Sequence, residues 1–305
     1  METHLTAADA AMLEEVTGVP LAALLDATVA AGAAPADALA GAGTLLEAAL
    51  SPVRFIPHAL NARGLHLLRV LLAERMDDAR RAALPPLPAD SAEEAGLAET
   101  WARDGVLRLD FARYTSSPAM GDAVGNERFN EVLRHASASR LPVEALEFVR
   151  RAVRHLGALD PQCALHCDTF HGVVKLWVYD ANVTRDHGPL HVVGGSHRAS
   201  LPKLRWLFAR TRDSAPSVVS EPSIRFDDLG TPGELAAAAL EQFGLPRATA
   251  VLPLPGVART LVIADTSALH CRGLAAEGTT RFSLRPMGAE NDGGVPRDNP
   301  FRLSD

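Results

Sequence analysis

Apolar residues recur at helical spacing in the first third of the chain. In the segment 64–84 the large apolar side chains lie three or four residues apart: Leu65, Leu68, Leu72 and Met76. This spacing predicts an amphipathic helix with one apolar face. A Pro-rich stretch at 84–90 then breaks the pattern and predicts a connection. We expect residues 1–90 to form a helical N-terminal extension that packs on or near the main domain.

The helical pattern continues beyond this connection. It predicts helices in three segments: 91–104, 126–135 and 142–156. In the first of them, Ser91 and Glu94 have the spacing of a capping box, and Gly105 follows the last turn. The third begins at a proline and is followed by a glycine, as helices often are. Between the first two, the alternating run VLRLD at 106–110 predicts a strand.

After residue 160 the pattern changes to short alternating or β-branched runs bounded by Gly, Pro and Asp. These runs are CALHC, VVKLWVYD, PLHVV, TAVLPLP, RTLVIAD and TRFSLRP. Each predicts a strand. Helices are expected to interrupt them at 202–210 and 232–243. Many short strands with long irregular connections indicate a jelly-roll or a barrel.

A His-x-Asp pair, His166 and Asp168, lies at the end of one of these runs. Residues i and i+2 of a strand point to the same face, so both side chains can reach one point while Cys167 faces away. His270, which follows the run RTLVIAD, is suitably placed as a third ligand. Two imidazoles and a carboxylate are the ligands of non-haem Fe(II) oxygenases. Three protein ligands with open positions also suit catalytic zinc, so the ligand set leaves the metal open.

Four other histidines near these runs are weaker candidates for ligands. His171 is expected to line the pocket on the substrate side or to cap a turn. His187 is expected to be a turn residue. His191 and His197 flank a Gly-Gly pair and are expected to be hydrogen-bonded structural groups.

Composition narrows the class of partner. Hydrophobic residues make up 47% of the chain, the formal net charge is −7, and basic residues form no stripe. We therefore expect a small-molecule substrate, no nucleic acid and no membrane, in a monomer or homodimer. The three cysteines are too few for a disulfide framework. The N-terminus is acidic where a signal peptide is basic, so a soluble cytoplasmic protein is expected.

Taken together, several motifs resemble those of one family. The motifs are H-x-D-x-x-H, K-x-W, D-H-G-P-L, G-G-S-H-R and A-D…H…R. In this order they resemble the phytanoyl-CoA dioxygenase family of Fe(II)/2-oxoglutarate-dependent oxygenases. The resemblance covers residues 100–286; the family commonly has a proline where Gly194 stands. It implies a mostly β fold with flanking helices, in which residues 91–305 form a double-stranded β-helix (jelly-roll, cupin-like) domain.

The resemblance also implies an activity and a set of cofactors. His166, Asp168 and His270 would bind Fe(II) and be the catalytic residues, with 2-oxoglutarate and O₂ as cosubstrates. The implied reaction is hydroxylation of an unactivated C–H bond in a small metabolite or natural-product intermediate, releasing succinate and CO₂. Halogenating relatives have a small residue where Asp168 stands, so its presence favours hydroxylation. Desaturation and ring formation use the same chemistry and stay open.

Further positions follow for the cosubstrate. By the resemblance, Arg281 would hold the distal carboxylate of 2-oxoglutarate with its guanidinium, and Trp177 would contact the cosubstrate. Strand alternation puts Lys175 and Tyr179 on the same inward face as Trp177. A buried lysine needs an anionic partner, so Lys175 is expected to meet 2-oxoglutarate or an acidic substrate. Tyr179 is expected on the substrate side.

Two hydroxyl residues flank the arginine at strand spacing. Thr279 and Ser283 are each two residues from Arg281, and both are expected to add contacts to the same carboxylate.

Two other classes of protein are compatible with these motifs. One is a jelly-roll metalloprotein of a different kind, such as a Zn or Mn hydrolase, an isomerase or a cupin-like binding protein. The other is a catalytically degenerate member used for interaction or sensing, which the presence of all four expected core residues disfavours.

Overall fold

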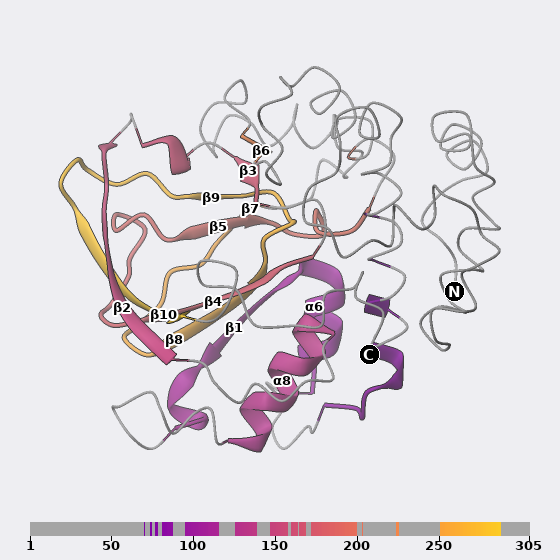
Figure 1. The fold of residues 1–305 in the computed structure, drawn as a ribbon. Coiled ribbons are helices and arrows are strands. Elements are labelled where there is room, and N and C mark those ends of the chain that lie inside the picture. The colour runs from indigo at the N-terminus through magenta and orange to yellow at the C-terminus, as the bar shows by residue number, and fades with distance from the viewer. Residues whose placement is uncertain are drawn as a thin grey trace.

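The structure is a computed structural model. It describes residues 70, 74, 77–78, 81–87, 95–115, 126–138, 147–157, 160–163, 165–168, 172–199, 203, 224–225 and 251–287. Its centre is a pair of five-stranded sheets that face each other (Figure 1). All named strand pairs in both sheets are antiparallel.

The first sheet is the one that carries helices on its outer face. Its strands lie in the order β1 (Val106–Asp110), β8 (Thr260–Asp265), β4 (Val174–Tyr179), β10 (Thr280–Met287) and β2 (Glu147–Arg154). The β4–β8 register places Trp177 opposite Val262 and Lys175 opposite Ala264. Ser283 of β10 lies opposite Tyr179.

The second sheet is built from shorter strands. They lie in the order β6 (Ile224–Arg225), β3 (His166–Cys167), β9 (His270–Arg272), β5 (Leu190–Val193) and β7 (Val251–Pro253). In the central pair, His166 of β3 lies directly opposite His270 of β9. A short 3-10 helix, η4 (Pro161–Cys163), precedes β3 and contacts β9.

The chain alternates between the two sheets. In sequence order, β2 and β4 belong to the first sheet, while β3 and β5 belong to the second; β7 and β9 then belong to the second sheet, with β8 and β10 in the first. This order is that of a double-stranded β-helix, with β1 added beside β8 and β6 beside β3. The fold predicted from the sequence, mostly β with flanking helices, is confirmed.

The first sheet buries both of its faces. On the outer face, Leu176 and Ile263 pack in one core cluster against α6 (Leu97–Asp104) and α8 (Glu127–Ser137). On the inner face, Trp177 and other residues of this sheet share a second cluster with Val192 of β5. Alternate residues of β4 thus face the helices and the space between the sheets, as the period-two pattern predicts.

Two predicted helices are corrected by the structure. The segment predicted as a helix over 142–156 contains β2, which pairs with β10 along its full length. Eight residues of continuous pairing outweigh a helical pattern in EFVRRAVR that fits either structure. The helix predicted to begin at Ser91 begins at Leu97. Its N-cap residue is Gly96, which has no side chain to cap the first turn. Residues 91–94 lie outside the described part, as do nearly all of the helices predicted at 202–210 and 232–243.

The other local predictions in this region agree with the structure. Strand β1 and helix α8 form where the sequence predicts them, and Asn126 caps α8 by accepting a bond from the Phe129 amide at 3.0 Å. Gly105 ends α6 with a φ of +69°, in the left-handed region that favours glycine. A 3-10 helix, η2 (Phe111–Arg113), follows β1.

Part of the predicted N-terminal extension contacts the β-domain through charged side chains. The guanidinium of Arg198, just after the Gly-Gly turn, binds both carboxylate oxygens of Asp78 at 2.9 and 3.1 Å and also pairs with Glu74 at 2.9 Å. Arg81 donates to the carbonyls of His135 and Ala136 at the end of α8. Residues 1–69 lie outside the described part, so the domain boundary at residue 90 stays a prediction.

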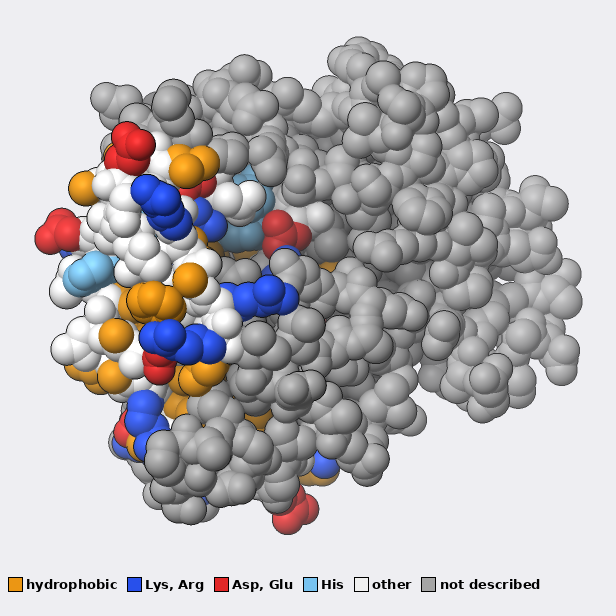
Figure 2. Space-filling view, turned by 60° about the vertical axis from the view of Figure 1, so that its left-hand side comes forward, with side chains coloured by type: hydrophobic (Ala, Val, Ile, Leu, Met, Phe, Trp, Pro, Cys, Tyr) orange, Lys and Arg blue, Asp and Glu red, His pale blue; other side chains and the backbone are white. Residues whose placement is uncertain are grey.

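The described surface carries charges of both signs. In Figure 2, Lys and Arg side chains lie among Asp and Glu side chains on the visible face. Within the described ranges, no helix is both long enough and apolar enough to cross a membrane.

Replacing Gly105 by alanine is expected to destabilise the fold more than the same change at Gly278. Both glycines have positive φ, +69° and +83°, so each alanine costs about 1 kcal/mol of backbone strain. A Cβ at Gly105 would also lie 2.5 Å from Nδ1 of the partly buried His197, whereas nothing lies within 4 Å at Gly278. Urea unfolding should show a further loss of about 1–3 kcal/mol for Gly105→Ala. Equal losses in the two variants would contradict the close packing of His197 against Gly105.

Candidate metal centre

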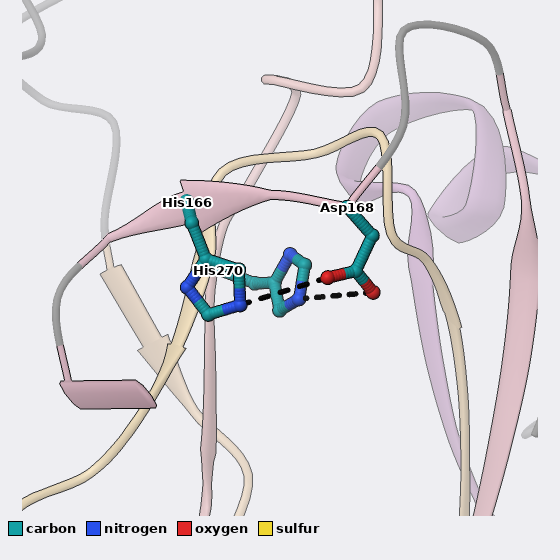
Figure 3. Close-up of side chains that lie close together, drawn as sticks. All are labelled: His166, Asp168 and His270. Atoms are coloured by element: carbon teal, nitrogen blue, oxygen red, sulfur yellow. Dashed lines mark ion pairs between the residues drawn. The ribbon is translucent and has the colours of Figure 1, made fainter. Parts of the chain in front are cut away.

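Three candidate ligand side chains converge from two paired strands of the second sheet, β3 and β9, and from the residue that follows β3. His166 and His270 are direct partners across β3 and β9, and their ring centroids lie 4.4 Å apart. Asp168 comes just after β3, where its backbone amide donates to the Thr266 carbonyl at 2.9 Å. That bond fixes the chain as it leaves the strand. The Asp168 carboxylate therefore turns toward both imidazoles (Figure 3).

The distances among the three side chains fit a single metal ion. Nε2 of His166 lies 3.6 Å from Oδ1 of Asp168, and Nε2 of His270 lies 3.6 Å from Oδ2. One ligand atom from each residue can be chosen so that all three lie within 4.8 Å of one another. Ligand atoms at about 2.0–2.2 Å from a common ion lie roughly 3–4 Å apart, so the two 3.6 Å separations fit such a site. Both histidines are buried, while the Asp168 side chain is 20% exposed, so the site is closed on the histidine side and accessible beside the carboxylate.

The orientation of His270 suits metal binding. Its Nδ1 lies 2.9 Å from the Ala268 carbonyl, so Nδ1–H donates there and the Nε2 lone pair faces Asp168. Burial lowers the pKa of His270, although the nearby Asp168 carboxylate opposes that shift. A neutral imidazole with its second nitrogen anchored to a carbonyl is the form that ligates metals.

Asp168 is held as a carboxylate by its surroundings. Burial raises its pKa, but His270 and the Lys175 ammonium together outweigh burial, and the pKa lies below its usual value. Nζ of Lys175 lies 2.8 Å from Oδ2 of Asp168. The anionic partner that an inward lysine requires is thus supplied by the protein itself, where the sequence led us to expect 2-oxoglutarate or an acidic substrate.

The cysteines beside the ligands do not offer thiolates. Burial raises the pKa of Cys167 and of Cys271 to about 12, and Cys163 is also shifted upward by burial. All three are free and buried. At neutral pH they are protonated thiols, which are poor metal ligands.

The inward face of the first sheet carries the residues expected to hold the cosubstrate. Arg281 of β10 is 7% exposed and donates to the Gly188 carbonyl at 2.6 Å. Ser283 is fully buried, and its Oγ has no hydrogen-bond partner among the described residues. Trp177 and Tyr179 are buried in the cluster between the sheets, and the Tyr179 hydroxyl donates to the Leu254 carbonyl at 2.6 Å.

The remaining predicted site residues differ in how far the structure describes them. Thr279 is partly buried and accepts a backbone bond from His155 at 2.9 Å just before β10 begins. His171 lies outside the described residues. The roles assigned to these residues, and to the three metal ligands, stay predictions.

Two of the histidines considered as weaker ligand candidates, His187 and His191, make local contacts through Nδ1. Nδ1 of His187 lies 2.8 Å from the Thr184 hydroxyl in a turn, and Nδ1 of His191 lies 3.2 Å from the Pro189 carbonyl. His197 departs from the expected pattern, because its Nδ1 has no hydrogen-bond partner among the described residues. Burial lowers the pKa of His197 to about 3, so this partly buried imidazole is neutral at neutral pH.

A partly buried ion pair that the sequence did not predict joins β9 to the segment before β3. Arg272, two residues after His270 on β9, donates to Oδ2 of Asp160 at 2.6 Å. Asp160 immediately precedes η4, which leads into β3, and it is 4% exposed. Nδ1 of the buried His155 lies 3.9 Å from the same oxygen. The arginine two residues beyond the ligand histidine was the available signal, but its partner is 112 residues away.

Comparison with known proteins gives a remote structural similarity. No protein-family model matches the sequence, and no curated protein matches it. EctD from S. alaskensis in its apo form is similar at 13% identity and a TM-score of 0.39, over 71% of this chain and 88% of that one. The epimerase SnoN in complex with Fe³⁺, alpha-ketoglutarate and nogalamycin RO is similar at 14% identity and a TM-score of 0.36, over 62% of this chain and 80% of that one. AviO1 from Streptomyces viridochromogenes Tue57 is similar at 13% identity and a TM-score of 0.33, over 66% of this chain and 94% of that one. Similarity at this level does not indicate a function, whereas the order of the strands in the two sheets establishes the double-stranded β-helix.

Removing a ligand side chain is expected to abolish metal binding. His166→Ala, Asp168→Ala and His270→Ala should each weaken Co²⁺ binding by more than about 100-fold, since even residues that only support a ligand contribute 10–100-fold. Isothermal titration calorimetry measures this directly. His187→Ala is the matched control, because that imidazole contacts a turn hydroxyl. Unchanged Co²⁺ affinity in any of the three ligand variants would show that the residue is not a ligand.

Proposed function

We propose that the protein is an Fe(II)- and 2-oxoglutarate-dependent oxygenase that hydroxylates a small molecule. The observation that supports this most is the triad: two buried imidazoles and one partly exposed carboxylate converge at one end of a double-stranded β-helix. Three protein ligands on one side leave the opposite coordination positions open, which is the arrangement of non-haem Fe(II) oxygenases. Bound Fe(II), with 2-oxoglutarate and O₂, would supply oxidative decarboxylation to succinate and CO₂ and oxygen transfer to a C–H bond.

The ligand residues would each contribute differently to the site. His270, anchored through Nδ1, would present Nε2 to the metal in a fixed direction. His166 would present Nε2 from the facing strand, and Asp168 would provide the single negative charge among the three ligands. Because Asp168 fills its position, a halide has no place there, which favours oxygen transfer over halogenation.

The cosubstrate would lie between the sheets, against β10 and β4. Arg281 would bind the distal carboxylate of 2-oxoglutarate, for which a guanidinium fork is suited. The buried Ser283 hydroxyl, two residues along the same face, would give that carboxylate a further donor. Thr279 would add a hydroxyl from the other side of the arginine, and Trp177 would pack against the cosubstrate chain.

Lys175 adds a second positive charge to this region. It would face the anionic part of the bound cosubstrate from β4, as it now faces Asp168. Tyr179 is proposed to lie on the substrate side, together with His171. Two inward cations fit an anionic small molecule better than a neutral one, since a buried charge requires a counter-charge. The substrate is therefore proposed to be a small anionic metabolite or natural-product intermediate.

The proposed activity can be tested without knowing the substrate. Such enzymes decarboxylate 2-oxoglutarate slowly in the absence of a substrate, so release of labelled CO₂ from 2-oxoglutarate should require Fe(II) and O₂ together. His270→Ala should lose this activity by more than about 100-fold through loss of the metal. His187→Ala should retain it. If CO₂ release did not depend on Fe(II), or if it survived in His270→Ala, the proposed function would be wrong.

Substitution of Arg281 should raise the KM for 2-oxoglutarate. A hydrogen bond to a charged group contributes about 1.5–3 kcal/mol, so Arg281→Met is expected to raise KM roughly 10–200-fold. Arg281→Lys keeps the charge but loses the bidentate geometry, so its KM should lie between those of the parent protein and Arg281→Met. Steady-state CO₂ release against 2-oxoglutarate concentration gives KM and kcat separately. A fall in kcat with unchanged KM would assign Arg281 to a role other than cosubstrate binding.

A further inference from the structure

The two oxygens of Asp168 have different neighbours. Oδ1 lies 3.6 Å from Nε2 of His166. Oδ2 lies 3.6 Å from Nε2 of His270 and 2.8 Å from Nζ of Lys175. The carboxylate and both imidazoles come from the second sheet and the residue after it, whereas Lys175 comes from β4 of the first sheet. A cation from one sheet is therefore held against the metal-binding carboxylate of the other.

We propose that Lys175 couples the binding of the metal ion to the binding of an anionic chelating ligand. Its ammonium weakens the binding of a divalent ion alone and strengthens the binding of a dianion to the metal-loaded site. The inference rests on the metal-binding role proposed for the triad and adds to it. It assigns Lys175 a thermodynamic effect on both partners, beyond a contact to one of them.

The sign of the effect follows from the formal charges. When both imidazoles are neutral, the charges of Asp168 and Lys175 sum to zero. A divalent ion therefore enters a neutral site, and the site with the ion bound has a charge of +2. A dianionic chelator then restores neutrality. Without the lysine, the ion would enter a negative site, and the dianion would meet a single positive charge. The lysine thus disfavours the first binding step and favours the second.

The position of Lys175 makes these effects large enough to measure. The ammonium lies 2.8 Å from Oδ2, so it would lie within about 5 Å of an ion bound through that oxygen. The Lys175 side chain is 22% exposed, and interactions between partly buried charges are screened less than those at the surface. Coupling between binding sites commonly amounts to 5–150-fold, and about tenfold is expected here.

A merely structural ion pair would give the opposite sign. If Lys175 did no more than hold Asp168 in position, its loss would loosen the carboxylate and weaken metal binding. Under the coupling proposed, its loss strengthens metal binding and weakens anion binding. Opposite shifts in one variant also exclude general misfolding, which would weaken both.

Calorimetric titrations of Lys175→Met test this directly. Co²⁺ alone should bind Lys175→Met about tenfold more tightly than the parent protein, and oxalate should bind the Co²⁺-loaded variant about tenfold more weakly. Lys175→Arg keeps the charge and should resemble the parent in both titrations. Arg185→Met is the matched control, because it removes one exposed positive charge from the β4–β5 connection and should change neither constant.

Two outcomes would overturn the coupling. One is Co²⁺ binding in Lys175→Met that is equal to or weaker than in the parent. The other is tighter Co²⁺ binding with no change in oxalate affinity. Oxalate needs only open positions on the metal, so this result does not depend on 2-oxoglutarate being the cosubstrate. Failure of the proposed oxygenase function would appear separately, as absence of Fe(II)-dependent CO₂ release from 2-oxoglutarate.

Discussion

The pairing of β3 with β9 is the constraint on which the site depends. These strands are short, and they bring together residues separated by about a hundred positions, because His166 and His270 are direct partners in an antiparallel register. A shift of one residue in that register would turn one imidazole to the other face of the sheet. The register is supported by neighbours on both sides: β9 also pairs with β5, and β3 also pairs with β6. The Asp160–Arg272 ion pair ties the segment before β3 to β9.

The second feature of the site is the positive charge between the two sheets. The space between the sheets holds apolar residues such as Trp177 and Val262, but it also holds two cations, Lys175 and Arg281. Each cation has an acceptor within the protein: Asp168 for the lysine, and the Gly188 carbonyl for the arginine. Buried charges are costly unless they are paired, so two cations on the inward face of the first sheet support the proposal that an anion binds there.

Local patterns were sufficient for much of the fold and for the convergence of two of the three candidate ligand side chains. Residues i and i+2 in a strand share a face, so the proximity of His166 and Asp168 could be predicted from spacing alone. The same rule correctly placed Lys175, Trp177 and Tyr179 on the inward face of β4. The place of His270 after the run RTLVIAD indicated it as a third candidate ligand, and the structure places it opposite His166. The motif resemblance supplied Arg281.

Features that depend on pairing between distant segments could not be predicted from the sequence. Strand β2 was predicted as a helix because EFVRRAVR suits both structures, and only its pairing with β10 decides between them. Strand β9 is three residues long, too short for a periodic signal. The contact of Lys175 with Asp168 requires knowing how the two sheets face each other, and the pairing of Arg272 with Asp160 requires knowing where η4 lies.

The central claim is that His166, Asp168 and His270 hold Fe(II) with open positions that accept 2-oxoglutarate. Visible absorption under anaerobic conditions tests it most directly, because chelation of Fe(II) by a 2-oxo acid produces a charge-transfer band. We expect a band that appears when Fe(II) and 2-oxoglutarate are both added to the protein and is lost in Asp168→Ala. A band of full strength in Asp168→Ala, or no band in the parent protein at saturating Fe(II) and 2-oxoglutarate, would contradict it.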